Sequence, residues 1–300
     1  MKGSQIAVFY GSANPALGRE VAKALRKKPG KLKIEKFPDG ETYCRFDEDI
    51  RGKHAFIVQS VCPPVSENFV ELLLILDAAK RMKPKKLTAV IPYYGYARQD
   101  RITKKGEPVS AQLAARAIKL AGADAAFALD LHSKAVEKFL KPKKHLHALP
   151  ALAKYFRKKK IKKLVVVAPD YGALKNARKQ ARVLGAKVAV IGKKRLSGKK
   201  VAMEGIRGNV QGKNCVIIDD IISTGGTMAQ AIRALKKHGA ENVYVAATHG
   251  LFVGPCIKRL NAAKPKEIIA TNSIPQSENR KKLKRLRVVS IAPLLAKAIK

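Results

Sequence analysis

The sequence contains no tryptophan, and aromatic residues make up only 6% of its 300 residues. Proteins that bind single-stranded nucleic acid by base stacking need exposed aromatic rings, so this class is poorly supported. The four cysteines, Cys44, Cys62, Cys215 and Cys256, lie far apart and form no CxxC pair. Their spacing does not fit a metal site, and it favours reduced, buried thiols over a disulfide framework.

Long apolar runs are also absent. The run from Val70 to Leu76 is interrupted by Glu71 and closed by Asp77, so it is too short to cross a bilayer. The first residues lead into an expected strand without the apolar segment and cleavage site of a signal peptide. We therefore expect a cytoplasmic protein that has no membrane partner.

Acidic residues are scarce: 22 Asp and Glu stand against 62 Lys and Arg, which gives a formal net charge of +40. Such an excess attracts polyanions, including nucleotides and nucleic acids. The basic runs Arg157 to Lys163 and Lys281 to Arg287 carry few aromatic residues and no RNA-binding signature. We interpret them as solvated faces and expect no specific nucleic-acid partner, with a nucleic-acid contact as the alternative.

What the chain does have is a regular alternation of short β-branched runs and helical periods. The expected strands are Ile6–Tyr10, Leu32–Phe37, Gly52–Ser60, Leu87–Pro92, Ala125–Leu129, Leu164–Ala168, Val188–Ile191, Cys215–Ile218 and Asn242–Ala247. The expected helices between them are Ala16–Arg26, Asn68–Arg81, Ala173–Leu184 and Thr227–His238, and Val288–Ile299 is expected to form a strand and a helix. This alternation predicts an α/β fold with mostly parallel sheets flanked by helices.

The order of elements in the first half recurs in the second half. The stretch from Gly212 to Asp220 repeats the stretch from Gly52 to Ser60, and the elements around both stretches correspond. Such self-similarity indicates an internal duplication. We therefore predict two similar domains, residues 1–145 and residues 146–300.

The most specific motif comes after the buried run Cys215–Ile218. Asp219 and Asp220 come first, and the loop is completed by Ser223, Thr224, Gly225, Gly226 and Thr227. Hydroxyls, glycines and free N–H groups at a helix N-terminus suit a phosphate monoester, and the acids suit the hydroxyls of a sugar. The alternative is an ordinary turn between a strand and a helix. The first copy has Gln59 and Ser60 at this place and neither glycine, so we expect it to have lost the ligand.

Two further segments suit a nucleotide. The segment from Tyr93 to Arg101 contains Arg98, whose planar cation pairs well with phosphate, and Gln99, which can bond a base or a sugar. The segment from Phe37 to Glu41 offers an aromatic face and two acidic acceptors. The alternatives are a polar loop with packed tyrosines and a plain turn.

Three strand-end groups complete the set of candidates. His132 and Asp170 each follow an expected strand, and such a sparse pair is compatible with Mg²⁺, which keeps most of its waters. Lys193 and Arg195 begin an expected mobile loop whose cations are suited to polyphosphate. A structural histidine and one more solvated basic run are the alternatives.

The loop sequence VIIDDIISTGGT resembles the phosphoribosyl-pyrophosphate loop of the type I phosphoribosyltransferase fold. Taken together, the segments resemble the ribose-phosphate pyrophosphokinase family over nearly the whole chain. They are FPDGE at Phe37, RGKHAFIVQS at Arg51, AVIPYYGYARQDR at Ala89, GEPVSAQLAA at Gly106, DLHS at Asp130, VVVAPDYGA at Val165, KKRLSG at Lys193, THG at Thr248 and TNSIP at Thr271. The segments are many, ordered and correctly spaced, so the match is specific.

This resemblance implies transfer of the β,γ-diphosphoryl group of ATP to the 1-hydroxyl of ribose 5-phosphate, with Mg²⁺ required and AMP released. It implies two type I phosphoribosyltransferase-like domains in a homodimer or larger homo-oligomer. The implied ATP-binding residues are Phe37, Asp39, Gly40, Glu41, Arg98 and Gln99, with the Phe37 segment reaching a neighbouring subunit's site. The implied metal ligands are His132 and Asp170, and the implied catalytic residues are Lys193 and Arg195. The implied ribose 5-phosphate residues are Asp219, Asp220, Arg195 and Ser223 to Thr227.

Two departures from the family pattern stand out. Ser223 opens the phosphate loop where many members have Asp, which looks like archaeal members, and Gly192 stands where an acid often precedes the catalytic lysine. Because Lys193 and Lys194 are adjacent, the register there is open by one residue. The rival hypotheses are a phosphoribosyltransferase, which would not need the duplicated domain, and a non-catalytic relative, which would have lost the site residues.

Overall fold

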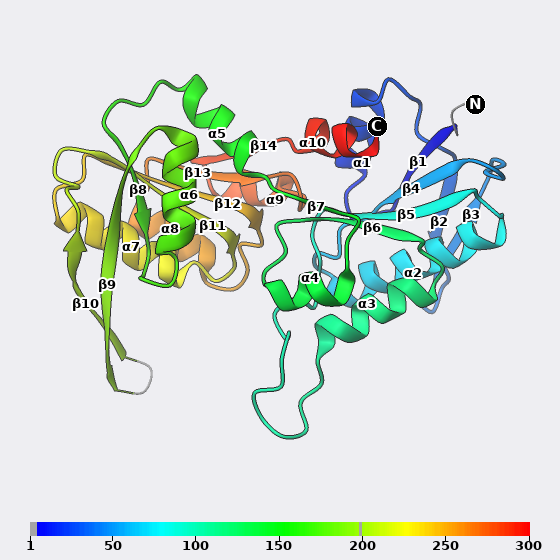
Figure 1. Ribbon diagram of the computed structural model, residues 1–300, viewed down its shortest axis with the longest axis horizontal. Coiled ribbons are helices and arrows are strands. Elements are labelled where there is room, and N and C mark those ends of the chain that lie inside the picture. Colours follow the sequence, from blue (N-terminus) through cyan, green and yellow to red (C-terminus); the bar gives the residue numbers. More distant parts are fainter. Residues whose placement is uncertain (1–4, 198–199) are drawn as a thin grey trace. The chain divides into compact units, whose positions relative to one another are not determined.

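The computed structural model describes residues 5–197 and 200–300, which form two compact units. The N-terminal unit comprises the chain up to His147 together with Ser273–Pro275 and Ser290–Lys300. The C-terminal unit comprises Ala148–Asn272 and Gln276–Val289. Each unit is built around one main parallel sheet with helices on its faces (Figure 1).

The sheet of the N-terminal unit has five parallel strands in the order β1-β4-β5-β6-β7. These strands are β1 (Ile6–Tyr10), β4 (His54–Val58), β5 (Lys86–Ile91), β6 (Ala125–Leu129) and β7 (Lys144–Leu146). The helices of the unit are α1 (Pro15–Ala24), α2 (Val65–Arg81), α3 (Ser110–Leu120), α4 (Lys134–Leu140) and α10 (Ala292–Ile299). Helices α2, α3 and α4 lie on one face of the sheet, and α1 and α10 lie on the other (Figure 1).

Because both faces are covered, successive strand residues are buried on opposite sides. Phe9 and Ile57 belong to the core beneath α2 and α3, whereas Val8 and Phe56 are buried on the opposite face. This explains why the strands show continuous apolar runs rather than alternation. The prediction of buried parallel strands is confirmed.

The last residues of the chain pack with the N-terminal unit, whereas the predicted second domain ran continuously to residue 300. Helix α10 lies against α1, and Leu295 and Ile299 are buried. The Nζ of Lys144 donates to the carbonyl of Ala298 at 2.6 Å. This helix is apolar enough to need a covered face, and α1 provides one.

The C-terminal unit has a seven-stranded sheet in the order β10-β9-β8-β11-β12-β13-β14. Strand β10 pairs antiparallel with β9, and the pairs from β9 to β14 are parallel. The strands are β8 (Leu164–Ala168), β9 (Lys187–Ser197), β10 (Lys200–Arg207), β11 (Asn214–Ile222), β12 (Asn242–Gly250), β13 (Glu267–Thr271) and β14 (Leu286–Val289). The helices are α5 (Leu149–Lys158), α6 (Leu174–Leu184), α7 (Gly226–Lys237), α8 (Cys256–Ala263) and α9 (Ser277–Lys282). Core residues of α7 and α8 pack on one face, and those of α5 and α6 pack on the other.

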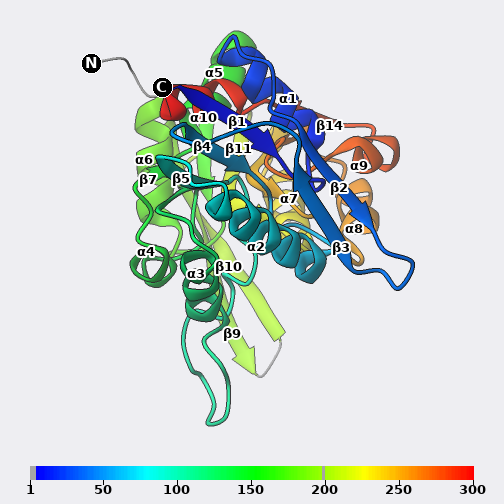
Figure 2. The ribbon, with the colours of Figure 1, turned by 90° about the vertical axis from the view of Figure 1, so that its right-hand side faces the viewer.

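The two sheets share a strand order, since β1-β4-β5-β6-β7 corresponds to β8-β11-β12-β13-β14. The units differ in the strands that come after the first helix of each copy. In the N-terminal unit, β2 (Leu32–Lys36) and β3 (Thr42–Phe46) form a separate antiparallel hairpin that projects away from the main sheet (Figure 2). In the C-terminal unit, β9 joins the main sheet beside β8.

Two expected boundaries are wrong in the same direction. Strand β9 continues to Ser197 because it pairs with β10, so Lys193 to Arg195 extend a strand rather than beginning a loop. Strand β11 continues to Ile222, so Asp219 and Asp220 belong to its last residues rather than following it. In both cases pairing with a neighbouring strand, which the local sequence does not reveal, lengthens the strand.

All four cysteines are free, and burial raises the pKa of the Cys62, Cys215 and Cys256 thiols to about 11. Thiols of this kind are unreactive at neutral pH. Across residues 5–197 and 200–300, no helix combines the length and apolar character that spanning a membrane requires.

Candidate active site

The loop between β11 and α7 presents several groups that have no partner in the described chain. The N–H groups of Ser223, Thr224 and Gly225 donate to none of the described residues. The hydroxyl of Ser223 is buried and likewise finds no hydrogen-bond partner among them. Buried polar groups are almost always paired, so the unpaired Ser223 hydroxyl, beside unbonded N–H groups at a helix N-terminus, indicates an anion site.

Gly225 is required in this loop for a different reason from the one that the sequence suggests. It has a φ of +70° and stands before the first residue of α7 as an N-cap that makes no side-chain hydrogen bond. A Cβ at this position would lie 2.7 Å from the Sγ of Cys256. The absence of a side chain therefore relieves strain and allows α8 to pack closely, whereas the sequence suggests that it makes room for a ligand. At Gly226, a Cβ would meet only the Nη1 of Arg259, at 3.5 Å.

Three carboxylates lie near this loop, within the C-terminal unit. Asp170, after the end of β8, accepts the N–H of Ala173 at 3.0 Å. Asp219 accepts the N–H of Asp220 at 2.9 Å. Burial, together with the neighbouring Asp220 and the charge of Asp170, raises the pKa of Asp219 to about 7. Acids held this close to one another favour cations or hydroxyl donors as ligands.

The raised pKa of Asp219 makes a prediction about stability. The folded protein holds this proton up to about pH 7, whereas the ordinary value is 3.8, so stability falls as pH rises through this interval. Asp219→Asn removes the cost of the buried charge, and we expect it to raise the free energy of unfolding at pH 8 by about 1 to 2 kcal/mol after allowance for solvent screening.

Urea titrations at pH 5 and pH 8 check this expectation, because the gain should shrink toward pH 5. An equal gain at both pH values would mean that packing, and not charge, is responsible.

Lys193 and Arg195 lie on β9, where Met203 of β10 pairs with Lys193 and Val201 pairs with Arg195. The β9–β10 hairpin projects past the end of β8 (Figure 1). The side chains of both residues lie outside the described part of the structure. Their catalytic role therefore stays a prediction.

In the N-terminal unit, the segment from Phe37 to Glu41 forms the turn of the β2–β3 hairpin. The N–H of Phe37 donates to the carbonyl of Glu41 at 2.8 Å, and the N–H of Glu41 donates to Asp39 at 3.1 Å. Gly40 has a φ of +93° with open space around it. The Phe37 ring is 49% exposed and makes an edge-to-face contact with the ring of Tyr43. An exposed aromatic ring on a stiff turn is available to a ligand or to another chain.

The segment after β5 divides into a buried part and an exposed part. Tyr93 and Tyr94 are buried, and the Tyr94 hydroxyl donates to the carbonyl of Ala111 at 2.9 Å. They are core residues, as the alternative hypothesis of packed tyrosines held. Gln99 is half-buried and accepts a hydrogen bond from the Ser110 hydroxyl, while Arg98 is exposed.

His132 is exposed and follows β6 at the carboxyl end of the N-terminal sheet. The neighbouring Ser133 caps α4, accepting the N–H of Val136 at 3.3 Å. Asp130 has a φ of +37° and bonds His147 at 2.9 Å. No cluster of three or more metal-ligating side chains occurs in the described parts of the chain, so any metal here has few protein ligands.

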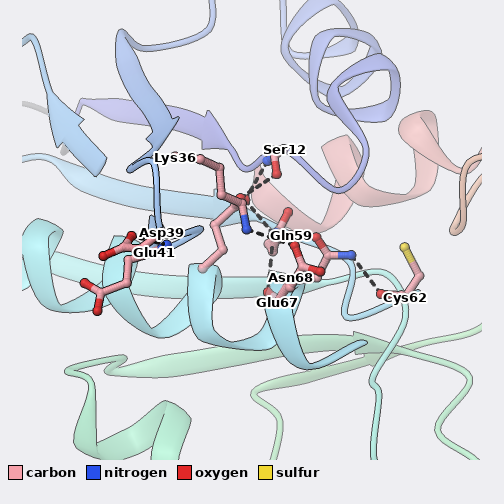
Figure 3. A network of polar contacts seen from close by, with 9 residues as sticks. Ser12, Lys36, Asp39, Glu41, Gln59, Cys62, Glu67 and Asn68 are labelled. Carbon is pink, nitrogen blue, oxygen red and sulfur yellow. Dashed lines mark hydrogen bonds and ion pairs between the residues drawn. The ribbon is translucent and has the colours of Figure 1, made fainter. Parts of the chain in front are cut away.

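The sequence interpretation missed a buried polar network at the same end of the N-terminal sheet. Glu71 of α2 is only 4% exposed, and it accepts the N–H of Ser12 at 2.6 Å, the Ser12 hydroxyl, and the side-chain amide of Gln59 at 2.7 Å. Gln59 also accepts the N–H of Ala13 at 3.3 Å. Figure 3 shows Ser12, Gln59 and Asn68 converging from three elements.

This network includes the strand end of the first copy that corresponds to the acids before the phosphate loop. Gln59 corresponds to Asp219 in the duplicated sequence. A Cβ at Gly11 would lie 2.4 Å from the Oε1 of Gln59 and 2.6 Å from the Oε1 of Glu71, so the backbone closes over both side chains. Glu71 in the apolar run of α2 was the available signal, because a lone acid on a buried helix face needs a partner.

We expect Glu71→Ala to destabilise the protein by about 2 to 4 kcal/mol, because it leaves the N–H and the hydroxyl of Ser12 and one amide N–H of Gln59 without an acceptor. The control is Glu67→Ala on the same helix, which removes an exposed ion pair with Lys36 of 2.8 Å (Figure 3). Exposed pairs contribute about 0 to 1 kcal/mol. Urea unfolding measures the free energy of unfolding of both variants. Similar losses in the two would show that the buried network contributes no more to stability than the exposed ion pair.

Comparisons with known proteins agree with this arrangement. Residues 6–122 match the model of the N-terminal domain of ribose phosphate pyrophosphokinase, and residues 192–300 match the phosphoribosyl synthetase-associated domain. The ribose-phosphate pyrophosphokinase of Caldanaerobacter subterraneus subsp. tengcongensis is 42% identical over 99% of this chain and 94% of its own. The chain belongs to the ribose-phosphate pyrophosphokinase family.

Further relatives support this assignment. The Bacillus subtilis ribose-phosphate pyrophosphokinase is also 42% identical, covering 97% of this chain and 92% of its own. The crystal structure of phosphoribosylpyrophosphate synthetase from Mycobacterium smegmatis has a TM-score of 0.89 at 38% identity, covering 99% of this chain and 98% of that one. The predicted fold is thus confirmed.

Membership of the family confirms further expectations. The chain is an enzyme with ribose-phosphate diphosphokinase activity, a transferase of nucleotide biosynthesis. The expected likeness to archaeal members finds no support, because these three relatives are bacterial.

Proposed function

We propose that the chain transfers the β,γ-diphosphoryl group of ATP to the 1-hydroxyl of ribose 5-phosphate, forming 5-phosphoribosyl 1-pyrophosphate and AMP. The observation that carries the proposal is the buried Ser223 hydroxyl, which has no partner in the described chain, beside the unbonded N–H groups of Ser223, Thr224 and Gly225. A phosphate monoester supplies acceptors for all of these donors. Gly226 and Thr227, in the first turn of α7, belong to the same site.

Asp219 and Asp220 position the sugar in this proposal. They lie near the end of β11, shortly before the phosphate loop, and their carboxylates accept hydrogen bonds from the ribose hydroxyls. The raised pKa of Asp219 fits a group that is costly to bury without a ligand and that gains hydrogen-bond donors on binding. A sugar held at both ends has its 1-hydroxyl fixed in direction, which favours attack on the β-phosphorus.

The N-terminal unit binds ATP in this proposal. Arg98 contacts the phosphates, Gln99 bonds the base or the sugar, and the turn Phe37–Glu41 supplies an aromatic face with the Asp39 and Glu41 acceptors and an open approach at Gly40. The exposure of the Phe37 ring and of Arg98 supports this role. Domains 1–145 and 146–300 thus bind different substrates.

Mg²⁺ is the cofactor, with His132 and Asp170 as its protein ligands. The group of acids around Asp170, which raises the pKa of Asp219, suits a hard divalent cation. When bound, the ion neutralises charge on the polyphosphate. Lys193 and Arg195 stabilise the charge that develops during transfer, and Arg195 also contacts the sugar phosphate.

The deciding experiment is to mix the protein with Mg²⁺, ATP and ribose 5-phosphate and to identify the adenine product. AMP is expected. ADP would indicate an ordinary kinase and overturn the proposal. Consumption of 5-phosphoribosyl 1-pyrophosphate with a nucleobase would indicate a phosphoribosyltransferase, and no turnover would indicate a non-catalytic relative.

The active form in this proposal is a homodimer or larger homo-oligomer, in which the Phe37 turn reaches a neighbouring subunit's site. The test is to mix inactive Phe37→Ser protein with inactive Lys193→Ala protein. Mixed oligomers regain a share of activity if the two residues act on different subunits, whereas no recovery places them on one chain. The free cysteines also support a cytoplasmic location.

A further inference from the structure

The segment that comes after β12 is hydrogen-bonded to the phosphate loop through the loop's carbonyl groups. Three successive carbonyls accept hydrogen bonds from residues 251–259. Ile222 O accepts the N–H groups of Leu251 at 2.9 Å and Phe252 at 3.1 Å, and Ser223 O accepts the N–H of Val253 at 3.1 Å. Thr224 O accepts a guanidinium N–H of Arg259 at 3.1 Å. These carbonyls are therefore paired, whereas the N–H groups of Ser223, Thr224 and Gly225 donate to none of the described residues and are left for a ligand.

Arg259 is the one side chain in this set of donors; the other donors are backbone groups. It lies on α8, and its Nη1 stands 3.5 Å from the point that a Cβ on Gly226 would occupy, beside the first turn of α7. No carboxylate among the described residues pairs with it, and its side chain is exposed. The loop therefore has an uncompensated cation at the helix N-terminus.

We propose that Arg259 is a further residue of the ribose 5-phosphate site, which both fixes the phosphate loop through Thr224 and supplies a cation beside the bound phosphate. This inference rests on the proposed binding of ribose 5-phosphate by the loop. The guanidinium has five N–H groups, so the bond to Thr224 leaves others free for phosphate oxygens. Hydrogen bonds between charged partners are about twice as strong as neutral ones.

Neither the loop motif nor the strand-end acids indicate Arg259, because it lies 35 positions along the chain from Thr224, to which it is bonded. Because the chain has 62 Lys and Arg residues, the charge of Arg259 does not distinguish it. Only the folding of residues 251–259 against the loop sets it apart. Lys258, its exposed neighbour on α8, has the same charge but no bond to the loop, which makes it a matched control.

The test is calorimetric titration of ribose 5-phosphate into the full-length protein and into three variants. Arg259→Ala should weaken binding by about ten- to a hundredfold, the range expected for losing a charged hydrogen bond. Arg259→Lys should retain most of the affinity, because it keeps the charge. The remaining loss would come from the fork of donors, which lysine lacks. Lys258→Ala should change the affinity by less than about twofold, as expected for an exposed charge.

Steady-state kinetics and chemical rescue separate a binding role from general support of the fold. Arg259→Ala should raise the KM for ribose 5-phosphate and leave the KM for ATP unchanged, and added guanidinium should restore part of the loss. If Arg259→Ala does not fold, Arg259→Gln decides, because it keeps a donor for the Thr224 carbonyl but removes the charge. Weakened binding of ribose 5-phosphate by a folded Arg259→Gln variant supports the role of the cation, and wild-type affinity in that variant means a purely structural role.

Failure of this inference can be told apart from failure of the proposed function. A wild-type protein that does not bind ribose 5-phosphate overturns the assignment of the loop itself. A wild-type protein that binds, together with an Arg259→Ala variant that binds equally well, overturns the role of Arg259 alone. Equal losses in Arg259→Ala and Lys258→Ala would mean that only the overall charge of α8 matters.

Discussion

Lys193→Ala should lower kcat by two to four powers of ten, about 3 to 5 kcal/mol of barrier, while the KM for ATP changes little. Diphosphoryl transfer leaves little covalent chemistry to the protein, so positioned cations contribute much of the rate. A cation that engages the polyphosphate chiefly in the transition state raises kcat more than it tightens ground-state binding. Steady-state kinetics with saturating ribose 5-phosphate measure the effect.

Lys194→Ala is the control, because it removes the same charge at the next position of β9. It should keep kcat within a few-fold of the wild type. A severe loss in Lys194→Ala with mild effects in Lys193→Ala would shift the catalytic register by one residue. Full activity in both variants contradicts a catalytic role for this strand.

Gly225→Val should destabilise the protein by at least about 3 kcal/mol, through two separate costs. A β-branched residue at a φ of +70° is strained. In addition, its Cβ would lie 2.7 Å from the Sγ of Cys256, so the two atoms would overlap. Overpacking adds about 1 to 3 kcal/mol. The midpoint of urea unfolding measures the loss, and wild-type stability would contradict the left-handed conformation.

Two further variants separate the costs. Gly226→Ala places its Cβ in ordinary contact with Arg259 only, so it should change stability by less than about 1 kcal/mol. Gly225→Val combined with Cys256→Ala removes the overlapping sulfur. The double variant should lose less free energy of unfolding than the two single variants lose together, since the effects of substitutions at neighbouring residues are not additive.

The sequence predicts those parts of the fold that depend on local period. Strands such as Leu164–Ala168 match the structure residue for residue, because buried parallel strands give unmistakable apolar runs. The strand-end position of Asp219 follows from the same pattern. Strand β2 is predicted, but its partner β3, the pairing of the two and the extension of β9 are missed, because they depend on pairing between segments, which no single segment encodes.

The candidate site shows the same limit. The composition of the phosphate loop is visible in the sequence, but the reason for Gly225 is not, because Cys256 lies far along the chain and reaches it only through α8. The bond from Ser12 to Glu71 likewise joins positions that are 59 residues apart in the chain. Long-range polar pairs carry no local signature, so Glu71 and Arg259 become visible only in three dimensions.

The N-terminus of α7 begins at a left-handed glycine, with no side chain to cap it. A helix in this condition keeps unsatisfied N–H groups, and capping such groups is worth about 0.5 to 2 kcal/mol. In the proposed complex the substrate supplies the missing cap, so occupancy and folding free energy are linked. At a hundred times its dissociation constant, a ligand adds about 2.7 kcal/mol to stability. The half-life of the protein against cellular proteases should therefore track the supply of pentose phosphate, and starvation for the sugar should shorten the life of the enzyme that consumes it.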